Sequence, residues 1–297
     1  MMAPSAAQDG SNHTMPNRLS LLLENVRIEQ AIFTLPFAYL GMTLAARGAP
    51  SLAQFGWATL AMVGARTFAM NMNRVIDLDL DRRNPRAAGR PLPSGRLSLR
   101  AVYLYSGLSV LLLFFSAWQL NPLCVTLFPL AMLVFTGYSY VKRFSWLTHA
   151  VLGLALGGAP VGGWIAVTGE LSWQAALLGA TVMSWATGFD ILYACGDAAQ
   201  DRALGVKTIP ACFGVRTALV VSALVHLGTA GLLMSVGVAF SLGWPYWVAV
   251  AGVAGMLAYE HWLVSPNDLS RLNVAFFRMN GAIAVLIFVF AFAGLYT

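Results

Sequence analysis

The chain has 297 residues, of which 58% are hydrophobic and only 10% are charged. A water-soluble domain is about half apolar and about a quarter charged, so this composition argues against a soluble enzyme with a large core. The net charge of +6 favours anionic lipid and an anionic substrate over nucleic acid, because the basic residues are spread among loops between apolar segments.

Apolar stretches long enough to cross a hydrocarbon core recur along the chain after a polar beginning. Residues 1–20 are predicted to form a disordered cytoplasmic tail without a signal-peptide core, and residues 21–297 a single transmembrane domain. The sequence predicts an all-α, multi-pass bundle of nine transmembrane helices. Their ranges are 28–46, 54–76, 101–119, 122–141, 147–167, 173–193, 216–238, 243–264 and 275–296.

The distribution of positive charge predicts the orientation of the bundle. When the 18 Lys and Arg residues are sorted into alternate loops and helix ends, all except Arg47 fall on one side. Short cytoplasmic loops retain positive charge, so we expect that side and the N-terminus to be cytoplasmic and the C-terminus to lie outside. Two longer segments on the cytoplasmic side, at about 77–100 and 194–215, are predicted to form cap loops.

Two acidic motifs follow the second and sixth predicted helices. The first contains Asn73, Asp77 and Asp81, each four residues after the last, so that they share one face of a helix. The second contains Asp197 and Asp201 with the same spacing. Because the motifs lie at corresponding helix ends, four spans apart, they indicate an internal duplication with a site between two halves.

Clustered carboxylates near a membrane repel one another and need a compensating cation. Their oxygens suit Mg²⁺, which takes one or two protein carboxylates and completes its shell with water and substrate phosphate. We therefore predict that the two motifs hold Mg²⁺ around a diphosphate. The alternative is that the aspartates form helix-end ion pairs with arginines such as Arg74, Arg82 and Arg202.

Basic and polar residues accompany these motifs. Arg66 lies seven residues before Asn73, on the same helical stripe but deeper in the membrane. Tyr138, Lys142 and Arg143 end the fourth predicted helix. Lys142 can bind phosphate as a point charge, and Arg143 can bind a carboxylate or phosphate through two hydrogen bonds; the alternative is that both are interfacial anchors.

Three further features complete the pattern. Residues 84–96, "NPRAAGRPLPSGR", contain too much Pro and Gly for a continuous helix and could either cover a bound diphosphate or anchor the chain to lipid headgroups. The four histidines show no metal-ligand spacing and are expected to be structural or exposed. The glycines of residues 157–163 are expected to form a close-packed helix face.

Three stretches closely resemble the signature regions of the UbiA superfamily of intramembrane prenyltransferases. They are "RTFAMNMNRVIDLDLDRRNPRAAGRPLPSG", "YSYVKRF" and "FDILYACGDAAQDRALGVKTIPACFG". The resemblance extends from about residue 18 through the rest of the chain and includes the nine-span layout. "GFDILYA" is most similar to the 4-hydroxybenzoate polyprenyltransferase-like branch, which includes enzymes proposed for menaquinone synthesis by the futalosine route.

The resemblance implies transfer of a polyprenyl group from prenyl diphosphate to 4-hydroxybenzoate or a related hydroxy-aromatic acid. It implies Mg²⁺ as cofactor, a role in ubiquinone or menaquinone synthesis, and a place in the inner (plasma) membrane of a prokaryote. The residues matching the family's Mg²⁺ and diphosphate motifs are Asn73, Asp77, Asp81, Asp197 and Asp201. Those matching polar positions around the diphosphate or the acceptor are Arg66, Tyr138, Lys142, Arg143 and Asp190, of which Lys142 and Asp190 are the candidate catalytic residues.

Other functions remain possible at this point. A prenyltransferase of the same fold could act on a futalosine-route naphthoate. A cation-coupled membrane transporter would also carry intramembrane acids and a repeat, although its acids are expected near the bilayer midplane and not at helix ends. A CDP-alcohol phosphotransferase is disfavoured because the sequence lacks the D-x-x-D-G-x-x-A-R signature.

Overall fold

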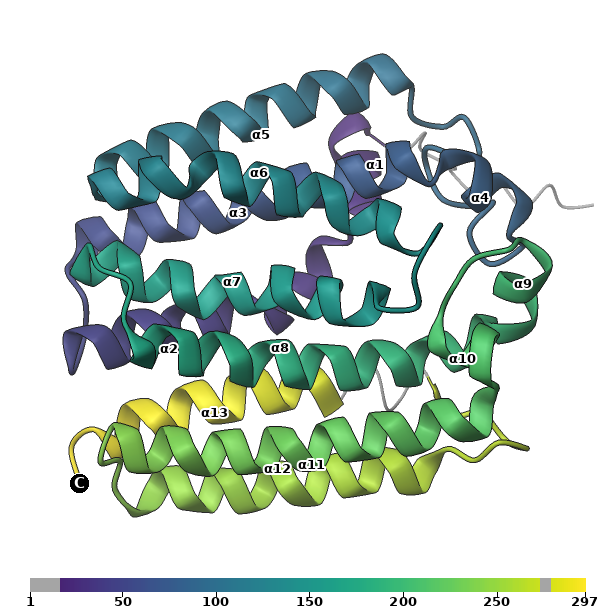
Figure 1. The fold of residues 1–297 in the computed structure, drawn as a ribbon. Helices are drawn as coiled ribbons and strands as arrows, with labels where there is room; N and C mark the ends of the chain where they lie inside the picture. The colour runs from purple at the N-terminus through teal and green to yellow at the C-terminus, as the bar shows by residue number, and fades with distance from the viewer. Residues whose placement is uncertain (1–16, 273–278) are drawn as a thin grey trace, which may run out of the picture.

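The computed structural model describes residues 17–272 and 279–297, and this part of the chain is built from long helices that run side by side (Figure 1). The long helices are α2 Leu35–Ala46, α3 Leu52–Ile76, α5 Leu99–Leu120, α6 Pro122–Val141, α7 Thr148–Thr168, α8 Trp173–Ala194, α11 Val215–Ala239, α12 Trp244–Leu263 and α13 Asn280–Gly294. Helix α7 lies between α2 and α8, and α11, α12 and α13 pack together beyond α8.

Short helices gather at one end of the bundle, which we call the cap end (Figure 1). They are α4 Leu78–Arg83, α9 Ala198–Ala203 and α10 Ile209–Phe213, together with the 3-10 helix η2 Cys195–Asp197. At the opposite end the long helices are joined by brief turns, such as the single residue Asn121 between α5 and α6. Room for polar chemistry therefore exists mainly at the cap end.

Each predicted span overlaps a long helix of the bundle, so the all-helical prediction is confirmed for the described residues. Five helical segments among these residues are long and apolar enough to cross a membrane. They are Leu99–Leu120, Pro122–Val141, Thr148–Thr168, Trp173–Ala203 and Val215–Ala239. Helices α2 and α13 are apolar but shorter, and positions 275–278 of the ninth predicted span lie outside the described residues, so the count of nine remains a prediction.

The first predicted span, 28–46, is not one α-helix. Residues Ile28–Phe33 form the 3-10 helix η1, and α2 begins only at Leu35. Pro36 stands in the first turn of α2. A proline ring clashes with the carbonyl four residues earlier, which disfavours a straight helix through this position, whereas the first turn tolerates proline; α2 accordingly begins at Leu35, with Thr34 as its N-cap.

Helix α1, Arg18–Val26, precedes this region and packs on α3. The side chain of Asn17 caps its first turn, and Leu21 and Leu22 are buried against Leu92 and Leu97 of the long loop after α4. Residues 18–20, the last part of the predicted tail, therefore belong to a helix, and the domain boundary itself stays a prediction. Positions 1–16 lie outside the described residues.

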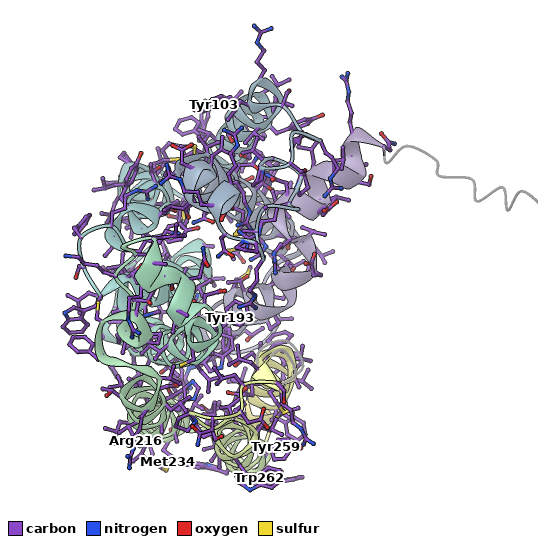
Figure 2. The ribbon with its side chains drawn as sticks, turned by 90° about the vertical axis from the view of Figure 1, so that its right-hand side faces the viewer. Tyr103, Tyr193, Arg216, Met234, Tyr259 and Trp262 are labelled. Carbon is purple, nitrogen blue, oxygen red and sulfur yellow. The ribbon has the colours of Figure 1, made fainter. Side chains whose placement is uncertain are left out.

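Exposed aromatic side chains mark both ends of the bundle. Tyr103 and Trp262 lie at the cap end, where Figure 2 shows them on the outside of the helices, and Trp118 and Trp244 lie at the opposite end. Tryptophan and tyrosine concentrate at the two membrane–water interfaces. Trp244 and Trp262 are 18 residues apart on α12, about 27 Å along a helix, which is close to the thickness of a hydrocarbon core.

Candidate active site

The first acidic motif lies at a break between α3 and α4. Helix α3 ends at Ile76, and Asp77 adopts φ −91° and ψ 4°, a conformation at the edge of the helical region. Backbone hydrogen bonds continue across the break, from the Asp77 N–H to the Asn73 carbonyl and from the Asp81 N–H to the Asp77 carbonyl. Two helices, α3 and α4, therefore keep the four-residue spacing of the motif, and α3 ends at residue 76, where the second predicted span ends.

Asp77 is the centre of a buried polar cluster. The Asn73 amide nitrogen lies 2.9 Å from Asp77 Oδ2, Lys142 Nζ lies 2.5 Å from the same oxygen, and Arg143 Nη1 lies 3.3 Å from Oδ1. Asn73 also donates to the hydroxyl of Ser139 at 3.1 Å, a residue that the sequence did not single out. The structure thus brings four predicted residues together from α3 and the end of α6.

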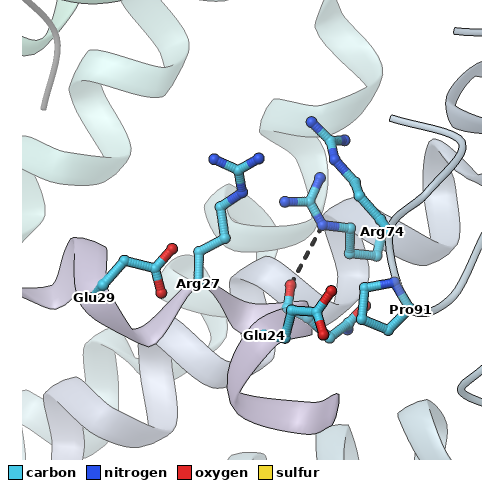
Figure 3. A pocket seen from close by; sticks show the side chains of 7 residues that line it. Glu24, Arg27, Glu29, Arg74 and Pro91 are labelled. Carbon is cyan, nitrogen blue, oxygen red and sulfur yellow. Dashed lines mark hydrogen bonds between the residues drawn. The ribbon is translucent and has the colours of Figure 1, made fainter. Parts of the chain in front are cut away.

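Asp81 faces a different set of cations. Arg90 Nη1 lies 2.9 Å from both oxygens of Asp81, and Arg74 Nη1 lies 3.6 Å from Oδ2. Arg90 belongs to the Pro- and Gly-rich segment predicted as a cap, so this segment folds back onto the first motif. Arg74 and Arg90 also line a pocket of about 270 Å³, into which Arg27 is directed from the end of α1 (Figure 3).

The second acidic motif repeats this backbone pattern. Asp197 ends η2 with φ −109° and ψ 4°, and a six-residue helix, α9, follows it just as six-residue α4 follows Asp77. Arg86 Nη1 lies 2.7 Å from Asp197 Oδ1. Burial alone would lower the pKa of Arg86, but the charge and hydrogen bond of Asp197 outweigh it and raise that pKa above its usual value. Asp201 accepts a hydrogen bond from the Thr208 hydroxyl at 3.1 Å.

The two motifs meet through the cap segments. Arg86 reaches from the first cap to Asp197, and the Gln200 side chain donates to the Arg83 carbonyl at 3.1 Å. Lys142, which holds Asp77, also attracts the Asp201 carboxylate electrostatically. The cap end therefore forms one polar layer with acidic groups from both halves of the chain.

The role of Asn73, Asp77, Asp81, Asp197 and Asp201 as metal ligands remains a prediction. Within residues 17–272 and 279–297, no three acidic, histidine or cysteine side chains are close enough together to hold one metal ion. The ion-pair alternative is seen in part, because Arg74 pairs with Asp81, whereas Arg202 Nε donates to the Ala211 carbonyl. Carboxylate and amide oxygens beside Lys and Arg are nevertheless the donor set suited to Mg²⁺ and a phosphate group.

A large apolar cavity lies beneath the polar layer. Its volume is about 700 Å³, and residues of α2, α3, α5, α6, α7 and α8 line it. Arg66 and Tyr138 stand near its cap end and Cys124 near the other. Cys124 and Tyr138 are 14 residues apart on α6, about 21 Å along the helix. Arg66 and Tyr138 thus border an elongated apolar space, while Asp77 belongs to the polar layer.

Glycines of α7 have two different roles around this cavity. A Cβ added at Gly157 would lie 2.6 Å from the Gly179 carbonyl oxygen, so this glycine permits close contact between α7 and α8, as expected. A Cβ added at Gly158 or Gly162 would meet no atom within 4 Å, and both residues line the cavity. The expectation of a uniform packing face is therefore wrong for Gly158 and Gly162.

Asp190 has a partner that sequence spacing did not reveal. Its Oδ2 lies 2.6 Å from Nδ1 of His149, a residue on the first turn of α7 whose side chain is only 2% exposed. His149 is 41 residues from Asp190, and no spacing rule connects the two. Arg86 and Arg90 were predicted only as part of a cap, and Ser139 and Thr208 carried no signal.

The match to a family model assigns the chain to a protein family. The model of the UbiA prenyltransferase family matches residues 34–295. The chain belongs to the UbiA prenyltransferase family. The curated relatives agree with this: the chain is 31% identical over 283 residues to the 4-hydroxybenzoate octaprenyltransferase of Cupriavidus necator, covering 92% of this chain and 96% of that protein. It is 33% identical to the enzyme of the same name from Aromatoleum aromaticum, with 92% and 94% covered.

Solved structures of the UbiA family share the fold. The apo structure of a UbiA homologue from Aeropyrum pernix K1 matches with a TM-score of 0.81 and 34% identity, over 89% of this chain and 97% of that one. A UbiA homologue from Archaeoglobus fulgidus, bound to GPP and Mg²⁺, matches with a TM-score of 0.72 and 19% identity, over 94% of this chain and all of that one. The second likeness supports the fold alone.

Proposed function

We propose that this UbiA family member transfers a polyprenyl group from prenyl diphosphate to 4-hydroxybenzoate or a related hydroxy-aromatic acid, with Mg²⁺ as cofactor. The observation that carries the proposal is the elongated apolar cavity that ends beneath a polar layer of acidic and basic side chains. An isoprenoid tail and a diphosphate require these two environments side by side. The names of the curated relatives support the aromatic acceptor and a polyprenyl donor.

The basic residues of the cap end would bind the diphosphate. Lys142, Arg143 and Arg90 already lie beside the carboxylates of the first motif, and Arg86 lies beside Asp197 of the second. Arginine binds phosphate oxygens through two parallel hydrogen bonds and lysine binds them as a point charge. Cations from both motifs would therefore surround one diphosphate.

The oxygens of Asn73, Asp77, Asp81, Asp197 and Asp201 would hold Mg²⁺. When bound, Mg²⁺ would offset the charge of the diphosphate and make it a better leaving group. The A. fulgidus homologue with GPP and Mg²⁺ gives a precedent for this cofactor within the fold.

The reaction breaks the allylic C–O bond of the donor, and the electron pair leaves with the diphosphate. Aromatic side chains that line the cavity near its cap end, Phe135 and Tyr138, can face the resulting allylic carbocation with their π systems. A ring carbon of the acceptor forms the new C–C bond, and loss of the ring proton restores aromaticity. The apolar walls exclude water, which would otherwise capture the cation.

Arg66 and Tyr138 are proposed to hold the acceptor at the cap end of the cavity. The guanidinium of Arg66 also donates to the Arg27 carbonyl at 2.8 Å, which fixes its position at the border of the apolar space. A fixed cation there suits the carboxylate of a hydroxy-aromatic acid. Asp190 is proposed to orient the acceptor or to accept its proton.

We further propose that residues 21–297 act as one transmembrane domain in the inner membrane of a prokaryote. The cap end and the N-terminus would face the cytoplasm and the C-terminus the outside, as the charge distribution predicts. A product of this chemistry is a precursor of ubiquinone or menaquinone.

The decisive experiment uses the purified protein with Mg²⁺, prenyl diphosphates of several lengths and two acceptors, 4-hydroxybenzoate and a hydroxynaphthoate. Mass spectrometry should detect the prenylated 4-hydroxybenzoate. Excess EDTA should abolish its formation and added Mg²⁺ should restore it. Undiminished turnover in EDTA would refute the metal site. Product from the naphthoate alone would transfer the proposal to the futalosine-route acceptor, and cation flux without any product would indicate a transporter.

A further inference from the structure

Three consecutive residues of the second cap, Lys207, Thr208 and Ile209, hold together different parts of the site. The Lys207 N–H donates to the Lys142 carbonyl at 2.7 Å, and the Thr208 hydroxyl donates to Asp201. The Ile209 N–H donates to Nε2 of His149 at 3.2 Å. This short segment therefore connects the end of α6, the start of α7 and the second acidic motif.

The two hydrogen bonds of His149 fix the location of its proton. A backbone N–H can only donate, so Nε2 must offer its lone pair to Ile209 and carries no hydrogen. The single proton of the neutral ring is then on Nδ1, where it is donated to Asp190 Oδ2 at 2.6 Å. With only 2% of its side chain exposed, His149 is held in this state by both partners.

This arrangement leaves His149 without a site for accepting a proton from a substrate. Asp190, in contrast, has a quarter of its side chain exposed, and His149 engages only one of its two carboxylate oxygens. The hydrogen bond restricts rotation of the carboxylate and leaves the second oxygen available. A carboxylate held in this way meets the demand for exact placement of a group that orients or deprotonates a bound acceptor.

We infer that His149 is a positioning residue, which orients Asp190 toward the acceptor and ties it to the segment of residues 207–209. The inference rests on the proposed function, because it deepens the role of Asp190 there. The competing possibility is purely structural: His149 would serve only to anchor the Ile209 backbone, and its bond to Asp190 would not affect catalysis.

Two substitutions separate these possibilities and serve as controls for each other. In His149→Asn the side-chain amide nitrogen takes roughly the place of Nδ1, so it can still donate to Asp190 but cannot reach Ile209. In His149→Gln the amide extends to the place of Nε2, so its oxygen can accept from Ile209 while the bond to Asp190 is lost. Thermal melting and size-exclusion chromatography report whether each variant folds.

We expect His149→Gln to lower kcat by about 10- to 100-fold, with little change in the KM of the prenyl donor, and His149→Asn to retain most of the turnover. Adding His149→Gln to Asp190→Asn should cause no further loss, since the histidine acts through that carboxylate. Turnover of His149→Gln equal to or above that of His149→Asn would overturn the inference, as would additive losses in the double variant.

A second readout is independent of activity. With ¹⁵N-labelled histidine, the signal that disappears in His149→Gln should show a protonated Nδ1 and an unprotonated Nε2. The opposite tautomer would overturn the inference even if the enzyme were active. Absence of product from the wild-type protein with every acceptor would overturn the proposed function instead, while the NMR result would still decide the state of His149.

Discussion

Asp77 and Asp79 are two residues apart in the same acidic run but have opposite surroundings. Asp77 is 2% exposed and is held by Lys142 and Arg143, whereas Asp79 is exposed on the outer side of α4. Helical spacing predicts this contrast, because positions two apart face different directions. The number of carboxylates in such a run is therefore a poor guide to the number of ligands.

Asp77→Ala and Asp197→Ala should each abolish prenyl transfer, whereas Asp79→Ala should leave it close to the wild-type rate. Loss of Asp77 also leaves Lys142 and Arg143 without their shared acceptor, at a cost of about 1–3 kcal/mol in the free energy of unfolding, since both cations keep some contact with water. Product formation and thermal melting of the three variants test this. Full activity of Asp77→Ala in a folded protein would contradict the proposed metal site.

The site could be predicted from the sequence where its contacts are local. Asn73 and Asp77 are one helical turn apart, and they do touch. The partner of Asp190, His149, lies 41 positions earlier, and His149 in turn accepts from the backbone N–H of Ile209, 60 positions after it. Contacts of this kind depend on how α7, α8 and α10 pack, so they cannot be predicted from the residue types alone.

At the scale of the helices, both acidic motifs share one backbone geometry. In each, an aspartate with ψ of 4° precedes a six-residue helix: Asp77 directly follows the long helix α3, and Asp197 ends the 3-10 helix η2 that follows the long helix α8. The sequence predicted the four-residue spacing and the end of the second span at residue 76, but not the separate short helix α4, because that spacing suits an intact helix and an interrupted one equally well. The shared geometry agrees with the internal duplication inferred from the positions of the motifs.

The different surroundings of the α7 glycines could not be predicted from the sequence. Gly157 and Gly158 are neighbours in a small-residue stretch and both line the cavity, yet only Gly157 packs so closely on α8 that an added Cβ would clash. Amino-acid type alone cannot separate a glycine needed for helix contact from one that leaves space for a ligand. Each role has a different consequence for substitution.

Gly158→Leu should leave the melting temperature close to that of the wild type and reduce turnover of long prenyl diphosphates more than that of short ones, because the new side chain enters the cavity. Gly157→Leu should lower the free energy of unfolding by about 1–3 kcal/mol or more, since it drives a side chain against the backbone of α8. Melting curves and relative rates with two donor lengths test the pair. Equal loss of both donors in Gly158→Leu would argue against a tail in this cavity.

At the scale of the whole molecule, the orientation is open to a direct test. Reporter fusions after residue 90 should give a cytoplasmic signal, and fusions at the C-terminus an external one, because all but one of the Lys and Arg residues sort to the cap side. A cytoplasmic signal at both positions would mean that the number of spans after residue 90 is even, whereas seven are predicted. An external signal at residue 90 would place the site on the other face.

The aromatic belts at the two ends of the bundle fix how deeply the protein sits in the bilayer, and so the depth of the cavity. Leu130 and Leu154 line the cavity and are more than half exposed, which connects it with the outer surface between α6 and α7. For a donor that reaches the site from the lipid, the effective concentration is the number of molecules per membrane area and not the number per volume of water. Adding inert lipid at constant bulk donor would then slow the enzyme by surface dilution, so rate constants for this protein should be expressed in mole fractions.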